Sequence, residues 1–482
     1  MTQAFTLLMS QCWIDGRWVA AADGATIEVH NPATGERVGL VPKLGADETR
    51  QAIAAAERAF DPWRDRTADE RARLLRRWAD LVMAQQEELA LIMTLEQGKP
   101  LAEARGEVAY AASYIEWFAE EARRVYGDVI PSPWADRELI AVKEPVGVCA
   151  AITPWNFPAA MITRKVAPAL AAGCTIIVKP ASQTPLSALA LARLAEQAGI
   201  PGGVLQVVTG SAAAIGGELT RSPVVRKLSF TGSTEVGRTL AAQCAPTLKK
   251  LSLELGGNAP FIVFDDADLD AAVQGVIASK YRNTGQTCVC TNRILVQDAV
   301  ADAFAEKLAV AVKALKVGNG TEPGVVQGPL IDAAALAKVE ELVADALSHG
   351  ARVLTGGRRH GLGGTFYEPT LLDDVSPQAK LAQEEIFGPV APLFRFASEE
   401  EAVRMANDTE FGLAAYFYSR DLARVWRVSR RLEYGMVGIN SGIISTAVAP
   451  FGGVKQSGYG REGSRHGIDE YVQLKYLCMG TA

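Results

Sequence analysis

Residues 146–158 read VGVCAAITPWNFP, an apolar run that ends in a polar turn bounded by two prolines. The run predicts a buried strand, and the apolar stretch at 159–170 predicts a helix behind it. The same alternation continues to residue 253, with further predicted strands at 175–178, 204–208 and 225–230. Strands that alternate with helices form a mostly parallel sheet with helices on both faces. We therefore predict an α/β fold that is built around this block.

The remaining chain extends this pattern. A second block of alternating strands and helices runs from residue 258 to about 440, and long helices are expected from 47 to 124. Residues 125–145 predict a two-stranded excursion, and 470–479 predict a closing apolar strand. A chain of 482 residues is long enough for two or three domains.

One helix of the first block has clear end signals. Thr184 is expected to cap it, with Pro185 at its first position and Gly199 past its end.

The composition is that of an ordinary globular protein, with 49% hydrophobic residues, 22% charged residues and a net charge of -6. No basic block indicates a nucleic-acid partner. Prolines and a glycine interrupt the longest apolar regions, which argues against a membrane span, and the N-terminus lacks the basic segment of a signal peptide. The seven cysteines form no C-x-x-C pair, so we expect neither a zinc site nor a disulfide framework. A reducing compartment, the cytoplasm, is the expected location.

The stretch YRNTGQTCVCTNR (281–293) holds Cys288 just after a flexible Gly-Gln turn, with Arg282 and Arg293 on either side. Such surroundings would keep the thiol accessible and electropositive, which favours the thiolate. Cys288 is therefore a candidate nucleophile. The alternative is a loop that happens to contain two cysteines, because most cysteines in such chains are buried small hydrophobes.

Two further polar residues follow predicted strands. Glu254 ends an alternating segment, just before Gly256-Gly257. It is either an ordinary solvated residue or a general base that faces an activated cysteine. Asn156 lies between Pro154 and Pro158, where its amide could serve as a donor for an oxyanion. The alternative for Asn156 is a turn residue that bonds its own backbone.

A phosphate site is indicated at residues 230–237, where FTGSTEVG follows a strand and opens a helix. The usual G-x-G-x-x-G pattern is absent, so this signal is weak on its own. The segments 153–158, 179–184 and 231–233 should line one crevice, because each follows a strand of the same sheet. The four histidines lie outside all these segments, which argues against a cysteine–histidine hydrolase and a histidine metal site.

Taken together, these segments resemble the aldehyde dehydrogenase superfamily over nearly the whole chain. Six motifs occur in the order and spacing of that family: 154–158, 230–233, 253–258, 285–288, 384–389 and 450–453. The segments 161–165, 280–293 and 442–445 resemble its succinate-semialdehyde branch.

The resemblance implies two doubly wound, parallel-sheet domains of the Rossmann type and a small β element for oligomerisation. The implied dinucleotide-binding domain comprises 1–124 and 146–256, and the implied catalytic domain comprises 257–453. Residues 125–145 and 454–482 would form the oligomerisation element of a homodimer or homotetramer.

The resemblance also implies roles for individual residues. Cys288 would be the nucleophile, Glu254 the general base, and Asn156 an oxyanion donor together with the backbone N–H of Cys288. The substrate's carboxylate tail would be bound by Arg164, Arg282 and Ser445. The dinucleotide would be bound by Trp155, Asn156, Lys179, Ser182, Gly232, Ser233, Leu255, Glu385 and Phe387.

The implied reaction oxidises an aldehyde through a cysteine thioester, passes hydride to a nicotinamide cofactor and needs no metal. We expect NADP, with NAD as a poorer alternative. Many family members that prefer NAD have a glutamate where this chain has Ser182, and Ser182 beside Lys179 should accept a 2′-phosphate.

Two guanidinium groups suit a carboxylate, so the expected substrate is succinate semialdehyde. Glutarate semialdehyde or another short-chain aldehyde is the alternative, and either arginine could instead pair with a protein carboxylate. A CoA-acylating enzyme is disfavoured by the presence of Glu254, and a non-enzymatic relative by the presence of Cys288 and Glu254 together.

The second cysteine of the loop, Cys290, carries a prediction of its own. A disulfide between Cys288 and Cys290 would close a small, strained ring, and strained disulfides are labile. We expect that oxidation could join the two reversibly and stop catalysis; the alternative is that Cys290 packs beneath the loop.

Overall fold

The first alternating block forms the centre of an eight-stranded sheet in the computed structural model, which describes residues 5–480. The strand order is β19-β11-β10-β7-β8-β9-β1-β2. The parallel centre consists of β7 (Val148–Ile152), β8 (Thr175–Lys179), β9 (Leu205–Val207), β10 (Val225–Thr231) and β11 (Lys250–Glu254). Antiparallel strands flank it: β1 (Cys12–Ile14), β2 (Arg17–Val19) and β19 (Gly458–Tyr459).

Helices cover both faces of this sheet because its buried strands are apolar on both sides. Cys149 and Ala151 of β7 pack into one hydrophobic cluster, and their neighbours Val148 and Ala150 pack into the opposite one. The first face is covered by α2 (Ala68–Ala84), α3 (Gln86–Gln97), α4 (Leu101–Glu121), α5 (Ala160–Ala172) and α6 (Leu186–Ala198). The second is covered by α1 (Ala46–Arg64), α7 (Ala212–Arg221) and α8 (Thr234–Cys244).

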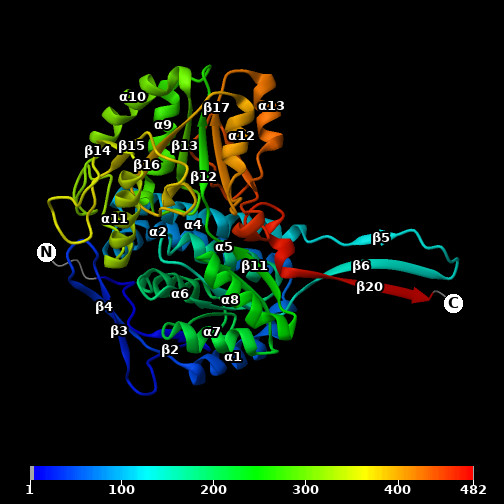
Figure 1. Ribbon diagram of the computed structural model, residues 1–482. Helices are drawn as coiled ribbons and strands as arrows, with labels where there is room; N and C mark the ends of the chain where they lie inside the picture. Colours follow the sequence, from blue (N-terminus) through cyan, green and yellow to red (C-terminus); the bar gives the residue numbers. More distant parts are fainter. Residues whose placement is uncertain (1–4, 481–482) are drawn as a thin grey trace.

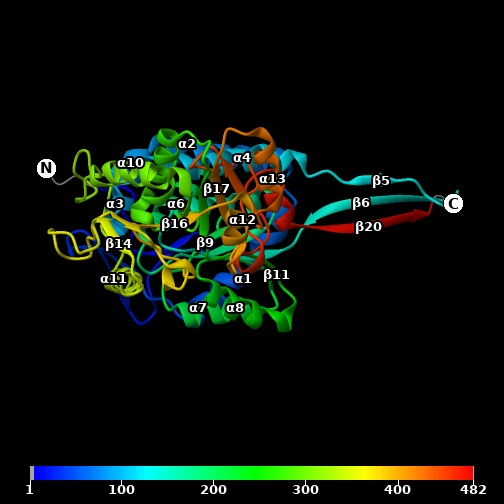
Figure 2. The same cartoon turned by 45° about the horizontal axis from the view of Figure 1, so that its top comes forward.

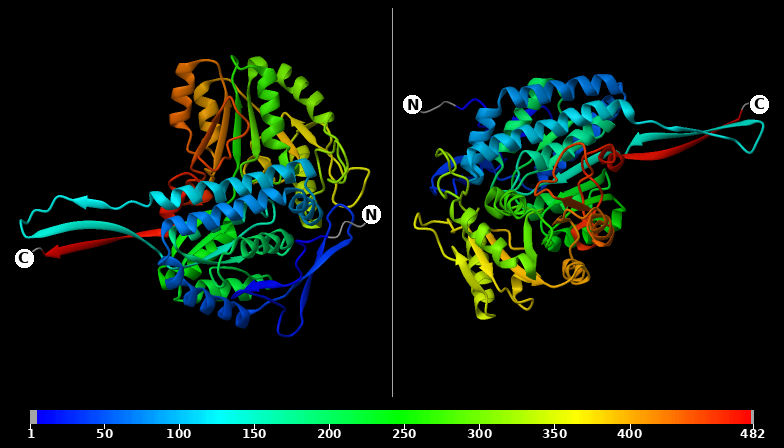
Figure 3. Two further views of the ribbon diagram at one scale, coloured as in Figure 1. Left: turned by 180° about the vertical axis from the view of Figure 1, so that it is seen from behind. Right: turned by 90° about the horizontal axis from the view of Figure 1, so that it is seen from above.

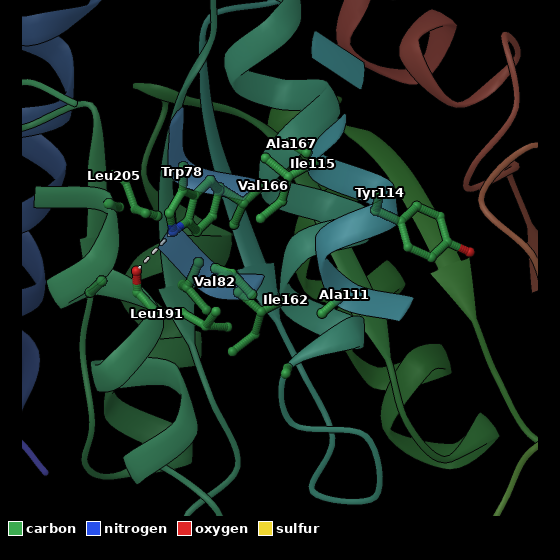
Figure 4. Close-up of a cluster of buried hydrophobic side chains, with 14 of the residues drawn as sticks. Trp78, Val82, Ala111, Tyr114, Ile115, Ile162, Val166, Ala167, Leu191 and Leu205 are labelled. Carbon is green, nitrogen blue, oxygen red and sulfur yellow. Dashed lines mark hydrogen bonds between the residues drawn. The ribbon is translucent and has the colours of Figure 1, made fainter. Parts of the chain in front are cut away.

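Figure 4 shows part of the first cluster, where Trp78 of α2 lies among side chains of α5 and α6. Its indole N–H donates to the Leu191 carbonyl across 3.1 Å. A buried tryptophan needs such a partner, since an unpaired N–H in a core is costly.

The cap expected at Thr184 is wrong. Pro185 is the N-cap residue of α6, with no side-chain cap bond of its own. Instead, the carboxylate of Glu96 on α3 accepts the N–H groups of Leu186 at 2.7 Å and Ser187 at 2.8 Å. A carboxyl acceptor from another helix therefore satisfies the free N–H groups at the start of α6.

The second block forms a seven-stranded sheet in the order β14-β15-β16-β13-β12-β17-β18. Its strands are β14 (Arg352–Thr355), β15 (Thr370–Asp373), β16 (Val390–Phe396), β13 (Thr291–Gln297), β12 (Ala259–Val263), β17 (Ala414–Tyr418) and β18 (Met436–Ile439). One face packs against α9 (Leu269–Lys280) and α10 (Ala301–Lys313). The other packs against α11 (Ala333–Ser348), α12 (Glu399–Asn407) and α13 (Leu422–Arg431).

A long β arm projects away from the two sheets (Figures 1 and 3). It consists of β5 (Asp128–Ile130), β6 (Arg137–Pro145) and β20 (Val472–Gly480). The last two pair antiparallel from Val472↔Pro145 to Gly480↔Arg137. Figure 2 shows the same arm after rotation, still clear of the main body. The strand expected at the end of the chain thus becomes one edge of this arm.

The predicted fold class, two doubly wound parallel-sheet units with a small β element, is confirmed. A separate hairpin, β3 (Thr26–His30) with β4 (Arg37–Pro42), completes the strands of the described chain. The domain boundaries themselves stay a prediction. Residues 458–459 lie in the eight-stranded sheet, so the arm takes its C-terminal strand from 472 onward. Within residues 5–480, no helix is long and apolar enough to cross a membrane.

Candidate active site

The loops after β7, β8 and β10 meet at one edge of the first sheet, because these three strands are neighbours. The N–H of Thr153 donates to the Lys179 carbonyl across 3.1 Å. A cavity of about 270 Å³ lies against this edge. Among the predicted site residues it is lined by Trp155, Asn156, Gly232, Ser233, Leu255, Cys288, Glu385 and Phe387.

Lys179 and Ser182 do not line this cavity. The Lys179 ammonium donates to the Pro180 carbonyl at 2.9 Å, and burial lowers the pKa of that side chain. Ser182 is exposed. The crevice expected from three loops is therefore formed, within this cavity, by the loops after β7 and β10.

The loop that carries Cys288 has an unusual backbone. Asn283, Thr284 and Gly285 have φ angles of 51°, 57° and 74°. An added Cβ at Gly285 would lie 2.2 Å from the Gly388 carbonyl oxygen, so this position requires glycine. The side-chain amide of Asn283 donates to the Asn156 carbonyl at 3.0 Å. These contacts hold the loop against the end of β7.

Asn156 is tied to the same loop through its side chain. Its Nδ2 donates to the Gln286 carbonyl across 3.0 Å, and its carbonyl accepts the Lys99 ammonium at 2.7 Å. Its own turn does not hold the amide, so the turn alternative is wrong. An amide nitrogen carries two hydrogens, which leaves one donor beside Cys288.

Cys288 lies at the wall between two spaces. It lines the 270 Å³ cavity and also a narrow pocket of about 10 Å³, where Arg164, Arg282 and Ser445 are found. Burial raises the pKa of the Cys288 thiol to about 12, and Arg164 opposes that shift only in part. The expected thiolate-favouring environment is therefore wrong for this structure.

The arginine on the C-terminal side of Cys288 does not face the thiol. The guanidinium of Arg293 turns into the second unit, where it donates to the carbonyls of Met405 at 2.6 Å and Ala406 at 2.8 Å. Its guanidinium therefore interacts with main-chain oxygens and not with the thiol of Cys288.

Glu254 ends β11 and is only 2% exposed. Neither carboxylate oxygen has a hydrogen-bond partner in the described part of the chain. Burial, and next the charge of Glu462, raise the pKa of Glu254 well above its ordinary value, against the opposite effect of Arg164 and Lys165. Burial thus makes the Glu254 carboxyl hold its proton more tightly than an exposed glutamate, and it can act as a base only after it loses that proton.

The two arginines of the narrow pocket differ. Arg164 on α5 forms an ion pair through Nε with Glu462, while Nη1 and Nη2 are buried without a partner among residues 5–480. Arg282 lies over the Phe157 ring at 5.3 Å and has no ion pair within the described chain. On the sequence alone, either arginine could pair with a protein carboxylate. Arg164 does so through Nε alone.

Glu385 and Phe387 of the second unit are among the residues that line the 270 Å³ cavity. The Glu385 carboxylate accepts the Gly257 N–H at 3.1 Å, and burial raises its pKa to about 7. The Phe387 ring packs edge-on against Trp155, with centroids 5.6 Å apart. Residues of both units therefore line this cavity.

Comparison with known proteins decides the family. The sequence profile of the aldehyde dehydrogenase family matches residues 18–477. The chain belongs to the aldehyde dehydrogenase family. Over 474 residues it is 66% identical to a glutarate-semialdehyde dehydrogenase of Pseudomonas aeruginosa and 65% identical to the NADP(+) succinate-semialdehyde dehydrogenase GabD of Escherichia coli, with 98% of each chain covered. A crystal structure of succinate-semialdehyde dehydrogenase from Burkholderia pseudomallei matches with a TM-score of 0.98 at 68% identity, covering 98% of both chains.

The chemistry of the large cavity fits the nicotinamide cofactor of an aldehyde dehydrogenase. Gly232 and Ser233 lead into α8, and the N-terminus of a helix attracts phosphate. A Cβ added to Gly232 would lie 2.4 Å from the Phe230 ring, so the backbone here is kept free of a side chain. The lining also contains the Glu385 carboxylate, which is able to accept hydrogen bonds from hydroxyl groups, and the Trp155–Phe387 aromatic pair, which offers a surface to a flat ring.

Sequence patterns did not predict Glu462, a buried residue that contacts Arg164 of the narrow pocket. Glu462 is buried and binds both Arg164 and Lys165. It lies 298 residues from Arg164 in a glycine-rich segment, without a periodic pattern around it. No local signal could have found it.

Cys290 is 1% exposed and lines neither space beside Cys288. Its thiol donates to the Lys280 carbonyl at 3.2 Å. The disulfide between Cys288 and Cys290 stays a prediction.

Proposed function

We propose that this aldehyde dehydrogenase oxidises succinate semialdehyde to succinate, with NADP as the preferred cofactor. The observation that carries the proposal is the pair of guanidinium groups in the narrow pocket beside Cys288. Arg164 leaves two nitrogens unpaired there, and Arg282 has no ion pair in the described chain. Buried guanidinium nitrogens without a hydrogen-bond acceptor are costly, so the carboxylate of a substrate tail would be stabilised there.

The size of the pocket supports a short tail. The pocket beside Cys288 and Ser445 holds about 10 Å³, and a neighbouring pocket of about 270 Å³ shares Tyr110 and Arg282 with it. Relatives of nearly equal identity are a succinate- and a glutarate-semialdehyde dehydrogenase. Glutarate semialdehyde is therefore the second candidate, because one methylene typically changes discrimination by only about 1–3 kcal/mol.

The proposed reaction begins when Cys288 loses its proton and adds to the aldehyde carbon. Asn156 Nδ2 and the Cys288 N–H would stabilise the oxyanion. As the oxyanion collapses, hydride would leave the adduct carbon for a nicotinamide cofactor held by the lining of the 270 Å³ cavity, and a thioester would remain on Cys288. Glu254, once ionised, would take a proton from the water that cleaves the thioester and releases the acid.

The NADP preference rests on Lys179 and Ser182, which lie beyond the cavity that suits the nicotinamide end. Ser182 carries no charge that would repel a 2′-phosphate, and Lys179 lies three residues before it.

The β arm supports a homo-oligomer, as a dimer or tetramer. Val129, Leu474 and Tyr476 expose 77%, 69% and 57% of their surface. Apolar side chains on a projecting strand pair are the kind of surface that a second subunit covers. The separation of the chain into an eight-stranded and a seven-stranded sheet supports residues 1–124 with 146–256 as the nucleotide-binding domain and 257–453 as the catalytic domain.

An aldehyde panel tests the proposed function. The rate of cofactor reduction is measured with succinate semialdehyde, glutarate semialdehyde and butanal, with NADP or NAD, and with or without CoA. The expected order of kcat/KM places succinate semialdehyde first and butanal last, without any need for CoA. Equal values for butanal and succinate semialdehyde would contradict a carboxylate-binding site.

A further inference from the structure

Glu462 is the counter-ion of two neighbouring cations on α5. Its Oε2 accepts Nε–H of Arg164, and its Oε1 accepts the Lys165 ammonium. The Lys165 ammonium also donates to Thr231 Oγ1 across 2.6 Å. All three charged side chains are at least nine-tenths buried. A buried carboxylate held by two cations has a single low-energy orientation, because each oxygen has its own donor.

The backbone around Glu462 also supports Arg164. Phe451 and Glu462 exchange two main-chain hydrogen bonds of 2.8 Å, as an isolated antiparallel bridge. This bridge brings the Phe451 ring to 4.1 Å from the Arg164 guanidinium carbon. One bridge thus supplies both a carboxylate for Nε and an aromatic face for the guanidinium plane.

These two contacts leave one direction for the rest of the guanidinium. The nitrogens Nη1 and Nη2 have no partner within residues 5–480, and Arg164 lines the narrow pocket with Cys288, Arg282 and Ser445. Because a guanidinium is planar and rigid, a bond at Nε determines where the other two nitrogens point.

We propose that Glu462 is a positioning residue for substrate recognition, which holds Arg164 so that its two free nitrogens meet the carboxylate tail of the aldehyde. The inference rests on the proposed carboxylate-bearing substrate. Glu462 touches neither the aldehyde nor the cofactor in this role. Its effect on the charged tail appears as a change in the ratio of KM for succinate semialdehyde to KM for butanal, because any effect of the Glu462 charge on the base Glu254 acts on both aldehydes.

The test compares KM for succinate semialdehyde, for butanal and for NADP in the parent enzyme and in Glu462→Gln. The variant should raise KM for succinate semialdehyde by roughly tenfold or more, since a charge-assisted bond to the orienting carboxylate is lost. The ratio of this KM to the KM for butanal should rise by a similar factor, and KM for NADP should stay within about twofold. Glu462→Asp should restore part of the loss, because it keeps the charge.

Glu470→Gln is the matched control. Glu470 accepts hydrogen bonds from buried Lys227 at 3.5 Å and from Ser252 at 2.8 Å, and it lines none of the spaces beside Cys288. The control should leave the KM ratio of the two aldehydes unchanged. If Glu462→Gln raises both aldehyde KM values equally, or leaves both unchanged, the proposal is overturned.

Glu462→Gln leaves two buried cations with a weaker partner and could fail to fold. A second variant provides the test in that case. Phe451→Leu removes the ring beneath Arg164 and keeps the Glu462 ion pairs; because Phe451 also lines the narrow pocket, only the ratio of the two aldehyde KM values is compared. It should raise KM for succinate semialdehyde relative to butanal in the same direction, and an unchanged ratio would overturn the proposal. If the parent itself shows no preference for succinate semialdehyde over butanal, the proposed function fails instead.

Discussion

The side-chain amide of Asn156 donates to the main-chain oxygen of Gln286 across 3.0 Å. This bond joins the end of β7 in the first sheet to the loop of the second unit that carries Cys288. The expected oxyanion donor and the expected nucleophile are therefore held in one fixed geometry, although 132 residues separate them in the sequence. Such preorganisation lowers the cost of reaching a transition state.

Asn156→Ala should lower the rate of the chemical step by about 10²–10³, which is typical for the loss of one oxyanion donor. Single-turnover formation of the reduced cofactor measures that step directly. Asn283→Gly is a useful control, since it removes a neighbouring bond to the same Gln286 carbonyl, keeps the Asn156 donor and tolerates the φ of 51°. An unchanged single-turnover rate in Asn156→Ala would remove this residue from the role.

The thiol of Cys288 should react slowly in the enzyme without cofactor. Burial raises its pKa to about 12, so the thiolate fraction is small at neutral pH and grows as the pH rises. The alkylation rate with iodoacetamide should still increase with pH up to about pH 10, as followed by peptide mass. A plateau below pH 8 would show a thiolate-stabilising environment that the geometry lacks.

Ser182→Glu should shift the cofactor preference. The new carboxylate would repel the 2′-phosphate of NADP and could accept the ribose hydroxyls of NAD. We expect kcat/KM for NADP to fall by roughly tenfold or more while kcat/KM for NAD is kept or raised. Ser182→Gln is the uncharged control of the same length. If neither cofactor responds to the glutamate, Ser182 does not contact this part of the dinucleotide.

Glu96 should make the stability of the first unit depend on pH. Burial raises its pKa to about 7 from an ordinary value of 4.5. The unfolded chain loses this proton first, so the contribution of Glu96 to stability is full below pH 4.5 and is lost as the pH rises through 7. Denaturant unfolding of the parent and of Glu96→Gln, from pH 5 to pH 8, measures the difference. The variant should be less stable at low pH, and the gap should narrow as the pH rises; a constant gap would contradict the titration.

Local sequence patterns predicted most of the fold because strand and helix periodicity depends on neighbours in the chain. The alternation at 146–253 gave the parallel centre of the first sheet, and the excursion at 125–145 gave the arm. The cap at Thr184 failed because Glu96 arrives from another helix. A contact of that kind has no local signature.

In the active site, too, local sequence patterns predicted some features and missed those that depend on distant residues. Trp155, Gly232 and Leu255 meet at one space because they follow the neighbouring strands β7, β10 and β11. Arg164 on helix α5 and Arg282 after helix α9 meet beside Cys288 without such a strand pattern. The charge environment of Cys288 could not be predicted, since Arg293 lies close in sequence and turns away in space. Glu462 could not be predicted either, because its partners on α5 are almost 300 residues away.

Capture of the covalent intermediate tests the central claim most directly. Glu254→Gln should remove the base that lets water cleave the thioester. When this variant is mixed with succinate semialdehyde and NADP, we expect one equivalent of reduced cofactor and a protein that gains the mass of one succinyl group on Cys288. Cys288→Ser should gain none. Steady turnover by Glu254→Gln, or a succinyl group on any residue other than Cys288, would contradict the account.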